Sequence, residues 1–258
     1  MVIAPFVMGA ALAVAVAAAA YRARALSASG AFAACVVGAV TFGTGGWQAA
    51  AVLLAFFIPS ALLSRYRKTR KQSLANTGKK GPRDAWQVAA NGGIAVLAIL
   101  LSPRYGGAMC AAFAGAFAAA SADTWGTEIG TLARSKPRSI LTARTLEPGI
   151  SGGITVRGTI AEVAGAACVA LVAAAVHIAP FFAVFLGGIA GALADSLLGA
   201  GVQALRYCPR CEQDCETNPH ECATPTSLRR GVAWIENNAV NLAASTCGAA
   251  LAAAVFLL

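Results

Sequence analysis

Long apolar stretches dominate this chain of 258 residues and limit what it can fold into. Eight such segments can be drawn, and they cover residues 2–20, 29–43, 46–64, 86–102, 106–122, 155–177, 180–204 and 236–258. The glycine-rich run at 43–46 predicts a tight turn between the second and the third. In lipid the backbone must satisfy its polar groups internally, which only helices and closed barrels do. Since about 20 apolar residues form one helical span, the sequence predicts an all-α transmembrane bundle of about seven to eight spans.

The composition indicates a single transmembrane domain over residues 1–258. Hydrophobic residues make up 58% and charged residues 12%, whereas a soluble domain carries roughly 25% charged residues. The net charge of +9 could suggest a nucleic-acid partner. The basic residues lie in short loops beside the apolar segments, however, as membrane orientation requires, so we expect no nucleic acid partner. A basic membrane surface instead suits lipid headgroups or phosphate-bearing substrates.

The distribution of basic residues predicts the orientation of the chain. If the loop after the first segment lies in the cytoplasm, nineteen of the twenty Lys and Arg residues fall on the cytoplasmic side, and Arg104 falls outside. This asymmetry follows the positive-inside rule. We therefore expect a multi-pass protein of the cell (plasma) membrane with both termini outside. All long polar loops, and any active site, should then lie on the cytoplasmic face.

Several carboxylates lie within apolar segments or at their ends: Asp123, Glu128, Glu162, Asp195 and Glu236. Ionised groups at membrane depth are costly and usually mark function. If the fifth segment continues as a helix, Asp123 and Thr127 share a face, as do Thr124 and Glu128. Oxygen ligands of this kind, shared with substrate phosphates, are those that Mg²⁺ prefers. The structural alternative is a helix end solvated by polar residues.

The motif around Asp195 resembles the one around Asp123, because in both an Ala-Asp-Ser/Thr run is followed by a glycine a few residues on. The similarity suggests that two helices present carboxylates to one centre. We therefore predict that Asp123, Glu128 and Asp195 form a catalytic Mg²⁺ site. The alternative for Asp195 is a lone carboxylate that is hydrogen-bonded to a neighbouring helix.

Glycine-rich and basic segments are candidates for phosphate binding. Ser151, Gly152 and Gly153 precede an apolar segment, and backbone N–H groups at a helix N-terminus attract anions. The Gly-Lys-Ser/Thr ending of a Walker A loop is missing. Loop cations suit phosphoryl transfer, which depends on positioning and charge neutralisation. The candidates are Lys79, Lys80, Arg83, Lys136 and Arg138. The alternative for these cations is topological anchoring.

Three amides, those of Asn237, Asn238 and Asn241, stand at the start of the last apolar segment. Asn237 and Asn241 share a helix face. The three side chains could contact a nucleotide or order the metal ligands. They could equally cap the helix and bond to neighbouring helices.

Four of the eight cysteines gather in a polar loop at about 206–235. A Cys-x₂-Cys pair followed by His and Cys has the spacing of a Zn²⁺ site, and a reducing cytosol argues against disulfides. We favour Cys208, Cys211, His220 and Cys222 as the ligands of a structural Zn²⁺, with Cys215 as the substitute. The alternative is a set of reduced free thiols.

Taken together, these motifs resemble a known family. They are the run from Ala122 to Gly130, Ser135 to Arg138, Pro148 to Thr155, Ala194 to Ala200 and Asn237 to Asn241. They are similar, in the same order, to those of a family of integral membrane proteins that includes plant phytyl-phosphate kinase and the transmembrane protein 19 group. The resemblance covers nearly the whole chain from about Gly81 onward.

The resemblance implies a CTP-dependent kinase that phosphorylates an isoprenoid (phytyl or other prenyl) monophosphate to the diphosphate. The Asp-bearing motif is more distantly similar to CDP-diacylglycerol synthases and dolichol kinases, which are membrane enzymes that use CTP and Mg²⁺. On this hypothesis the carboxylates hold Mg²⁺ against the CTP phosphates, and the loop cations neutralise them. The alternatives are a lipid-phosphate cytidylyltransferase and a lipid-phosphate transporter. The oligomeric state stays open, with a homodimer among the alternatives.

Overall fold

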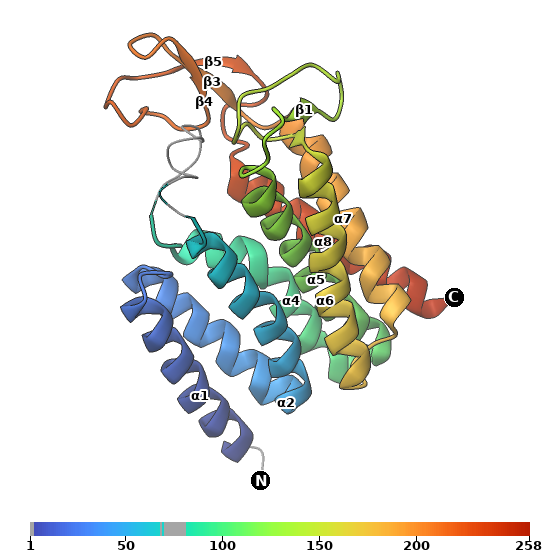
Figure 1. Cartoon of the computed structure of the whole chain (residues 1–258). Helices are drawn as coiled ribbons and strands as arrows, with labels where there is room; N and C mark the ends of the chain where they lie inside the picture. Colours follow the sequence, from blue (N-terminus) through green and yellow to red (C-terminus); the bar gives the residue numbers. More distant parts are fainter. Residues whose placement is uncertain (1–2, 68, 70–80) are drawn as a thin grey trace.

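The computed structural model of the chain describes residues 3–67, 69 and 81–258 (Figure 1). Its helices are α1 (Ile3–Arg22), α2 (Ala28–Arg65), α4 (Ala85–Tyr105), α5 (Gly107–Gly130), α6 (Val156–Ala175), α7 (Phe181–Gly201) and α8 (Asn237–Leu257). Short strands occupy the polar loops: β1 (Arg138–Ser139), β2 (Gly153–Ile154), β3 (Leu205–Cys208), β4 (Gln213–Cys215) and β5 (Ser227–Arg230). The helical bundle predicted from the sequence is confirmed, and the strands are additions outside it.

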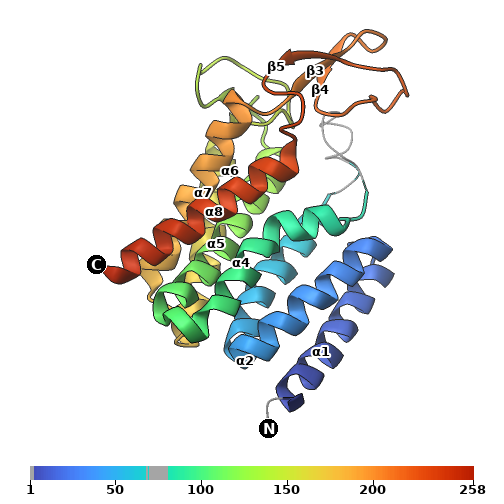
Figure 2. The same ribbon diagram turned by 180° about the vertical axis from the view of Figure 1, so that it is seen from behind.

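The strands form two small antiparallel sheets. β1 pairs with β2, with Arg138 opposite Ile154 and Ser139 opposite Gly153. The second sheet has the order β4-β3-β5 and belongs to residues 205–230, which connect α7 to α8 and are called the polar insert below. Figures 1 and 2 show the polar insert at one end of the bundle, outside the helices.

Helix α2 folds back on itself at Gly46, where the turn was expected. Both of its ends lie near Arg83: Ser27, before its first residue, donates from its backbone N–H to the Arg83 carbonyl at 3.0 Å, and Arg83 Nη2 donates to Ser64 Oγ at 3.4 Å. A straight helix of 38 residues would separate its ends by roughly 55 Å. Gly46 has φ 66° and ψ −162°, and Gly106, between α4 and α5, has φ 69° and ψ −147°. Glycine adopts this conformation without the steric cost of a side chain.

Helix α5 lies at the centre of the bundle. Every residue from Ala111 to Ala122 is buried, and Figures 1 and 2 show other helices around it. Its Ala and Gly residues let neighbouring backbones approach, as is usual where membrane helices pack. A Cβ on Gly191 of α7 would meet Ala119, and one on Gly248 of α8 would lie 2.7 Å from the Ala119 Cβ. The small residues thus place α5, α7 and α8 in direct contact.

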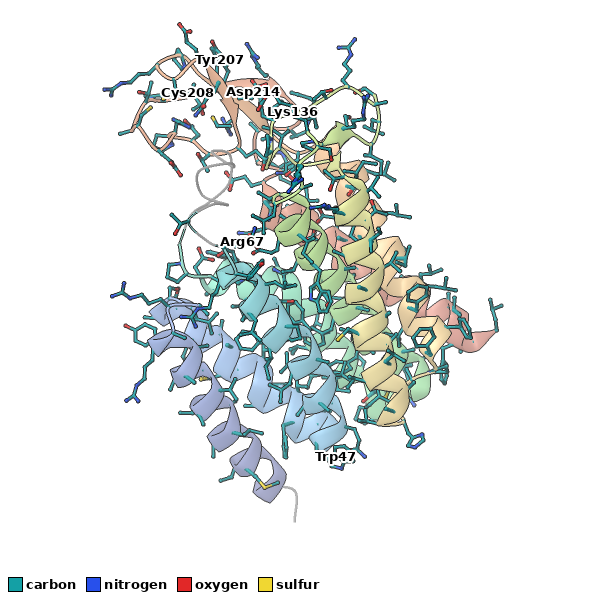
Figure 3. The ribbon with its side chains drawn as sticks, viewed as in Figure 1. Trp47, Arg67, Lys136, Tyr207, Cys208 and Asp214 are labelled. Atoms are coloured by element: carbon teal, nitrogen blue, oxygen red, sulfur yellow. The ribbon has the colours of Figure 1, made fainter. Side chains whose placement is uncertain are left out.

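Helix caps and exposed tryptophans distinguish the two ends of the bundle. Side-chain caps begin α2, α4 and α6 at the end where the polar insert lies, through Ser27, Asp84 and Thr155. Lys136, Tyr207 and Asp214 mark this end in Figure 3, and Trp47 marks the opposite end. Exposed tryptophans at both ends are typical of membrane–water interfaces, and Trp47 and Trp86 are 61% and 76% exposed.

Among the described residues, five helices are long and apolar enough to cross a membrane: α2, α4, α6, α7 and α8. Helix α1 contributes a shorter apolar stretch, Val7–Arg22. The chain is therefore a helical, multi-pass membrane protein by length and composition, and the number of seven to eight spans stays a prediction.

The close contact between α5 and α8 predicts that Gly115→Ala destabilises the bundle. An added Cβ would meet Ala252 and would lie 2.6 Å from the Gly248 carbonyl oxygen. Overpacking of this kind costs about 1–3 kcal/mol, so we expect a lower melting temperature in detergent, measured by size-exclusion chromatography after heating. Gly93→Ala in α4 is the matched control, because a Cβ there meets nothing within 4 Å. Equal melting temperatures for the two variants would contradict the prediction.

Candidate functional site

A polar cavity of about 670 Å³ opens among the helix ends next to the polar insert. Residues from α4, α5, α6, α7 and α8 line it, together with the loop 148–155 and residues 216–218 of the polar insert. Six carboxyl groups belong to this lining: Asp123, Glu128, Glu162, Asp195, Glu216 and Glu236. Carboxyl groups that lie far apart in the sequence therefore line the same cavity.

The carboxyl groups of Asp123 and Asp195 are in hydrogen-bonding contact. Asp123 belongs to α5, which continues as a helix to Gly130, and Asp195 belongs to α7. The Thr127 side chain, one turn on from Asp123, also bonds to it. The structure thus brings together the two aspartates that the sequence analysis assigned to one centre. Two carboxyl groups in contact either share a proton or hold a cation between them.

Glu162 of α6 is a further carboxylate at this centre. It interacts electrostatically with both Asp123 and Asp195. The Glu162 side chain packs directly against Gly126 of α5. A Cβ added at Gly126 would lie 2.7 Å from Glu162 Oε1, so the absence of a side chain there makes room for the Glu162 carboxyl group. Glu162 is visible in the sequence as a carboxylate at membrane depth, but no motif there assigns it a role. Its position inside an apolar segment was the signal that could have identified it.

Arg83 is held in the cavity wall by its backbone and its side chain. Its N–H donates to the Ala25 carbonyl at 3.0 Å, and its own carbonyl lies against Gly30, where no side chain would fit. Burial lowers the pKa of the Arg83 guanidinium, and the nearby carboxylates Glu128 and Asp123 oppose that shift. Arginine stays protonated in proteins. Arg83 therefore brings a fixed positive charge to the carboxylates.

One amide of α8, that of Asn241, contacts the carboxylate of Asp195. With its nitrogen facing that carboxylate, Asn241 donates to Asp195 Oδ2 at 3.1 Å and accepts from Asn237 Nδ2 at 3.2 Å. This orientation is assigned from the neighbouring donors and acceptors. Asn238 also lines the cavity. This contact agrees with two of the roles weighed for these amides, because it orders a carboxylate and also joins α8 to the neighbouring helix α7.

The glycine-rich loop at residues 148–155 binds a side chain of the same protein, the carboxyl group of Glu216. The Ser151 backbone N–H donates to Glu216 Oε1 at 2.7 Å, and its hydroxyl donates to Glu216 Oε2 at 3.0 Å. Gln203 Nε2 donates to the same Oε2 at 2.9 Å. The Gly153 N–H donates to the Ile150 carbonyl at 3.2 Å, and the loop at Gly152 packs against Ala200.

Glu216 was missed by the sequence analysis because Ser151 lies 65 residues away along the chain. No local pattern pairs the polar insert with this loop. Burial raises the pKa of the Glu216 carboxyl, while the hydrogen bonds from Ser151 and the charge of Arg230 act in the opposite direction. The carboxylate nevertheless faces donors on several sides, which is the environment that an anion requires.

The remaining predicted cations lie elsewhere. Lys136 forms an ion pair with Glu147 at 2.7 Å, with both side chains largely exposed. Arg138 donates from Nη1 to the Ala143 carbonyl at 3.0 Å. Neither residue lines the cavity, although their neighbours Ser135 and Pro137 do. Lys79 and Lys80 fall outside the described residues.

The Cys and His side chains of the polar insert form a second cluster. The ligand atoms of Cys208, Cys211, His220 and Cys222 all lie within 4.8 Å of one another. Cys215 is not a member of this cluster, and its Sγ donates instead to the Thr217 carbonyl at 3.8 Å.

Comparison with known proteins places these features in a family context. The family described as integral membrane protein DUF92 matches residues 11–249. The chain is 35% identical over 182 residues to an uncharacterised membrane protein of Methanocaldococcus jannaschii, across 69% of this chain and 75% of that one. It is 28% identical over 218 residues to Protein PGR of Arabidopsis thaliana, across 73% and 75% of the two chains. No solved structure matches.

The contacts of Glu216 predict how the polar insert is held to the bundle. In Glu216→Ala the Ser151 N–H and the Gln203 amide lose their acceptor, so we expect trypsin to cleave the polar insert several times faster, for example after Arg206 or Arg210. Cleavage rates followed by mass spectrometry test this. Glu212→Gln is the control, since Glu212 is exposed. An unchanged rate in Glu216→Ala would show that these hydrogen bonds do not fasten the polar insert.

Proposed function

The chain belongs to the DUF92 family of integral membrane proteins, and on that premise we propose that it is a CTP-dependent kinase that converts an isoprenoid monophosphate to the diphosphate. Membership confirms the family resemblance noted from the motifs. The observation that best supports the proposed activity is the meeting of Asp123 and Asp195, from two different helices, in the wall of a polar cavity. Arg83 stands beside them.

The donor set at this centre fits a hard cation. Asp123, Asp195 and Glu162 offer oxygen ligands only, and Mg²⁺ prefers such ligands and shares them with substrate phosphates. Glu128, which the sequence analysis included, lines the same cavity and faces Arg83. When bound, Mg²⁺ would neutralise the charge of the phosphate oxygens. Asn241 would hold Asp195 in the orientation that this role requires.

The size of the cavity is compatible with a nucleotide. About 670 Å³ lies within the range of roughly 300–1,000 Å³ that small-molecule sites occupy. We propose that the positively charged side chain of Arg83 binds the phosphate groups of the substrates. Lys79, Lys80, Lys136 and Arg138 stay in the proposal as loop cations, although Lys136 and Arg138 do not line the cavity in this structure. The amides of Asn237 and Asn238 are proposed to contact the nucleotide.

A narrow apolar groove beside the cavity suits the lipid tail. It has a volume of about 90 Å³ and is lined almost entirely by apolar side chains of α1, α2 and α4. The groove and the cavity share Leu26, Phe57, Arg83, Gln87 and Asn91. A prenyl phosphate could therefore place its phosphate near Arg83 and the first part of its tail in the groove, with the remainder in the surrounding lipid.

The proposed reaction needs no general base. An oxygen of the acceptor phosphate attacks the γ-phosphorus of CTP, the bond from that phosphorus to the β–γ bridging oxygen breaks, and CDP leaves. The acceptor phosphate is largely ionised near neutral pH because its second pKa is about 6. None of the described residues that line the cavity is a histidine. The abundance of basic residues at this end favours a cytoplasmic location for the reaction, in the cell membrane.

The metal role predicts that Asp123→Asn and Asp195→Asn each lower turnover by roughly 10²-fold or more, because a ligand charge is lost. The purified protein would be supplied with CTP, Mg²⁺ and phytyl or geranylgeranyl phosphate. Asp214→Asn is the matched control, since Asp214 forms an exposed ion pair with Arg229 at 2.9 Å. Full activity in either cavity variant would remove the metal role.

The products of the same assay separate the proposal from its rivals. Release of CDP with a prenyl diphosphate supports the kinase, whereas release of pyrophosphate would identify a lipid-phosphate cytidylyltransferase. A lipid-phosphate transporter would consume no CTP and would move the lipid between leaflets of a vesicle. A transporter needs ionisable groups along a path through both leaflets, whereas the six carboxyl groups described above all line one cavity.

The apolar groove predicts a selective effect on the lipid substrate. Leu54→Trp would fill the groove, so we expect a higher KM for the prenyl phosphate and an unchanged KM for CTP. Ile58→Trp, one turn further along α2 and 49% exposed, is the control for adding an indole to this helix. Equal KM values for the lipid in the two variants would show that the tail lies elsewhere.

A further inference from the structure

The polar insert folds almost without a hydrophobic core. Within residues 205–230, all of which the structure describes, the buried side chains are those of Cys208, Cys215 and His220. A segment of this size, with a three-stranded sheet and no apolar interior, needs a cross-link or a metal ion to hold one conformation. The four clustered side chains, Cys208, Cys211, His220 and Cys222, are the groups in this segment that could form a disulfide or bind a metal ion.

The distances between the ligand atoms match a tetrahedral metal site. Cys208 Sγ and Cys222 Sγ are 3.5 Å apart, and His220 Nδ1 is 3.3 Å from Cys222 Sγ. With Zn–S bonds of about 2.3 Å and Zn–N bonds of about 2.0–2.1 Å, tetrahedral ligands stand roughly 3.4–3.8 Å from one another. A disulfide would need the sulfur atoms at about 2.05 Å. The cysteines are therefore spaced for a shared ion rather than for a bond to each other.

Two tight turns present these ligands in pairs. Cys208 ends β3 and Cys211 follows in the turn before β4, where Glu212 has φ 52°. His220 and Cys222 lie in a second turn, closed by a hydrogen bond from the Ala223 N–H to the His220 carbonyl at 2.8 Å. Two ligand-bearing turns facing each other around four donors are the arrangement of zinc-binding loops.

Polar side chains surround the donors and hold them in place. The Gln213 amide lies 3.2 Å from His220 Nε2, the ring nitrogen that does not face the cysteines. The Thr224 hydroxyl lies 3.3 Å from Cys222 Sγ. Partners of this kind orient metal ligands and fix the histidine tautomer.

We propose that Cys208, Cys211, His220 and Cys222 bind one Zn²⁺ ion that replaces the missing core of the polar insert. The ion closes the site with four protein ligands and leaves no position for a substrate, so its role is structural. It also fixes the strand β4, which leads directly into Glu216. The ion therefore holds in place the segment that lies against Ser151. This proposal does not depend on the kinase activity.

Metal analysis of the purified full chain in detergent tests the site. We expect about one Zn²⁺ per chain, as for other four-ligand structural sites, and Co²⁺ reconstitution should give the absorption bands of tetrahedral cobalt with thiolate ligands. Cys211→Ser removes an exposed ligand and should lower the bound zinc at least tenfold. Cys215→Ser and Cys247→Ser are the controls and should keep it.

Three results would overturn the proposal. The first is wild-type protein without zinc, both as purified and after incubation with the metal. The second is unchanged zinc in Cys211→Ser. The third is loss of zinc in Cys215→Ser with retention in Cys211→Ser, which would assign a different ligand set. Because the readout is bound metal, failure of the kinase assay would leave these results unaffected.

Discussion

The close approach of α5, α7 and α8 is the constraint on which the rest of the structure depends. Alanine and glycine occupy the contacts between these helices, and at Gly191 and Gly248 the neighbouring residue leaves no space for a Cβ. Larger side chains would move the helices apart and would separate Asp123 from Asp195. The Ala and Gly residues of the apolar segments therefore allow the carboxyl groups of α5 and α7 to lie close together.

Much of the fold could be predicted from the sequence, because a membrane limits the choice of backbone structure. The apolar segments became helices close to their expected limits, Gly46 formed the expected turn, and α5 continued beyond Asp123 to Gly130. Motifs on separate helices also indicated a shared centre for Asp123 and Asp195. These successes rest on periodicity and on the cost of buried charge, both of which are local properties of the sequence.

What the sequence did not indicate depends on contacts between distant segments. Glu216 lies in a loop that looks like a zinc-binding segment, and nothing near it suggests that it reaches Ser151. Lys136 was expected near the phosphates, yet its ammonium group pairs with Glu147, eleven residues on. Glu162 was visible as a buried charge, but its neighbours could be known only from the crossing of α5 and α6, which Gly126 permits.

The hydrogen bonds between Glu216 and Ser151 affect the apparent affinity of any anion that binds to this loop. A ligand that uses the Ser151 N–H competes with a carboxylate tethered to the same chain, and it binds only in the fraction of molecules in which that carboxylate has left. Its apparent dissociation constant is the intrinsic one divided by this fraction. Anions with no further contacts in the cavity would therefore occupy the loop poorly, whereas a ligand anchored at a second point could displace the internal competitor.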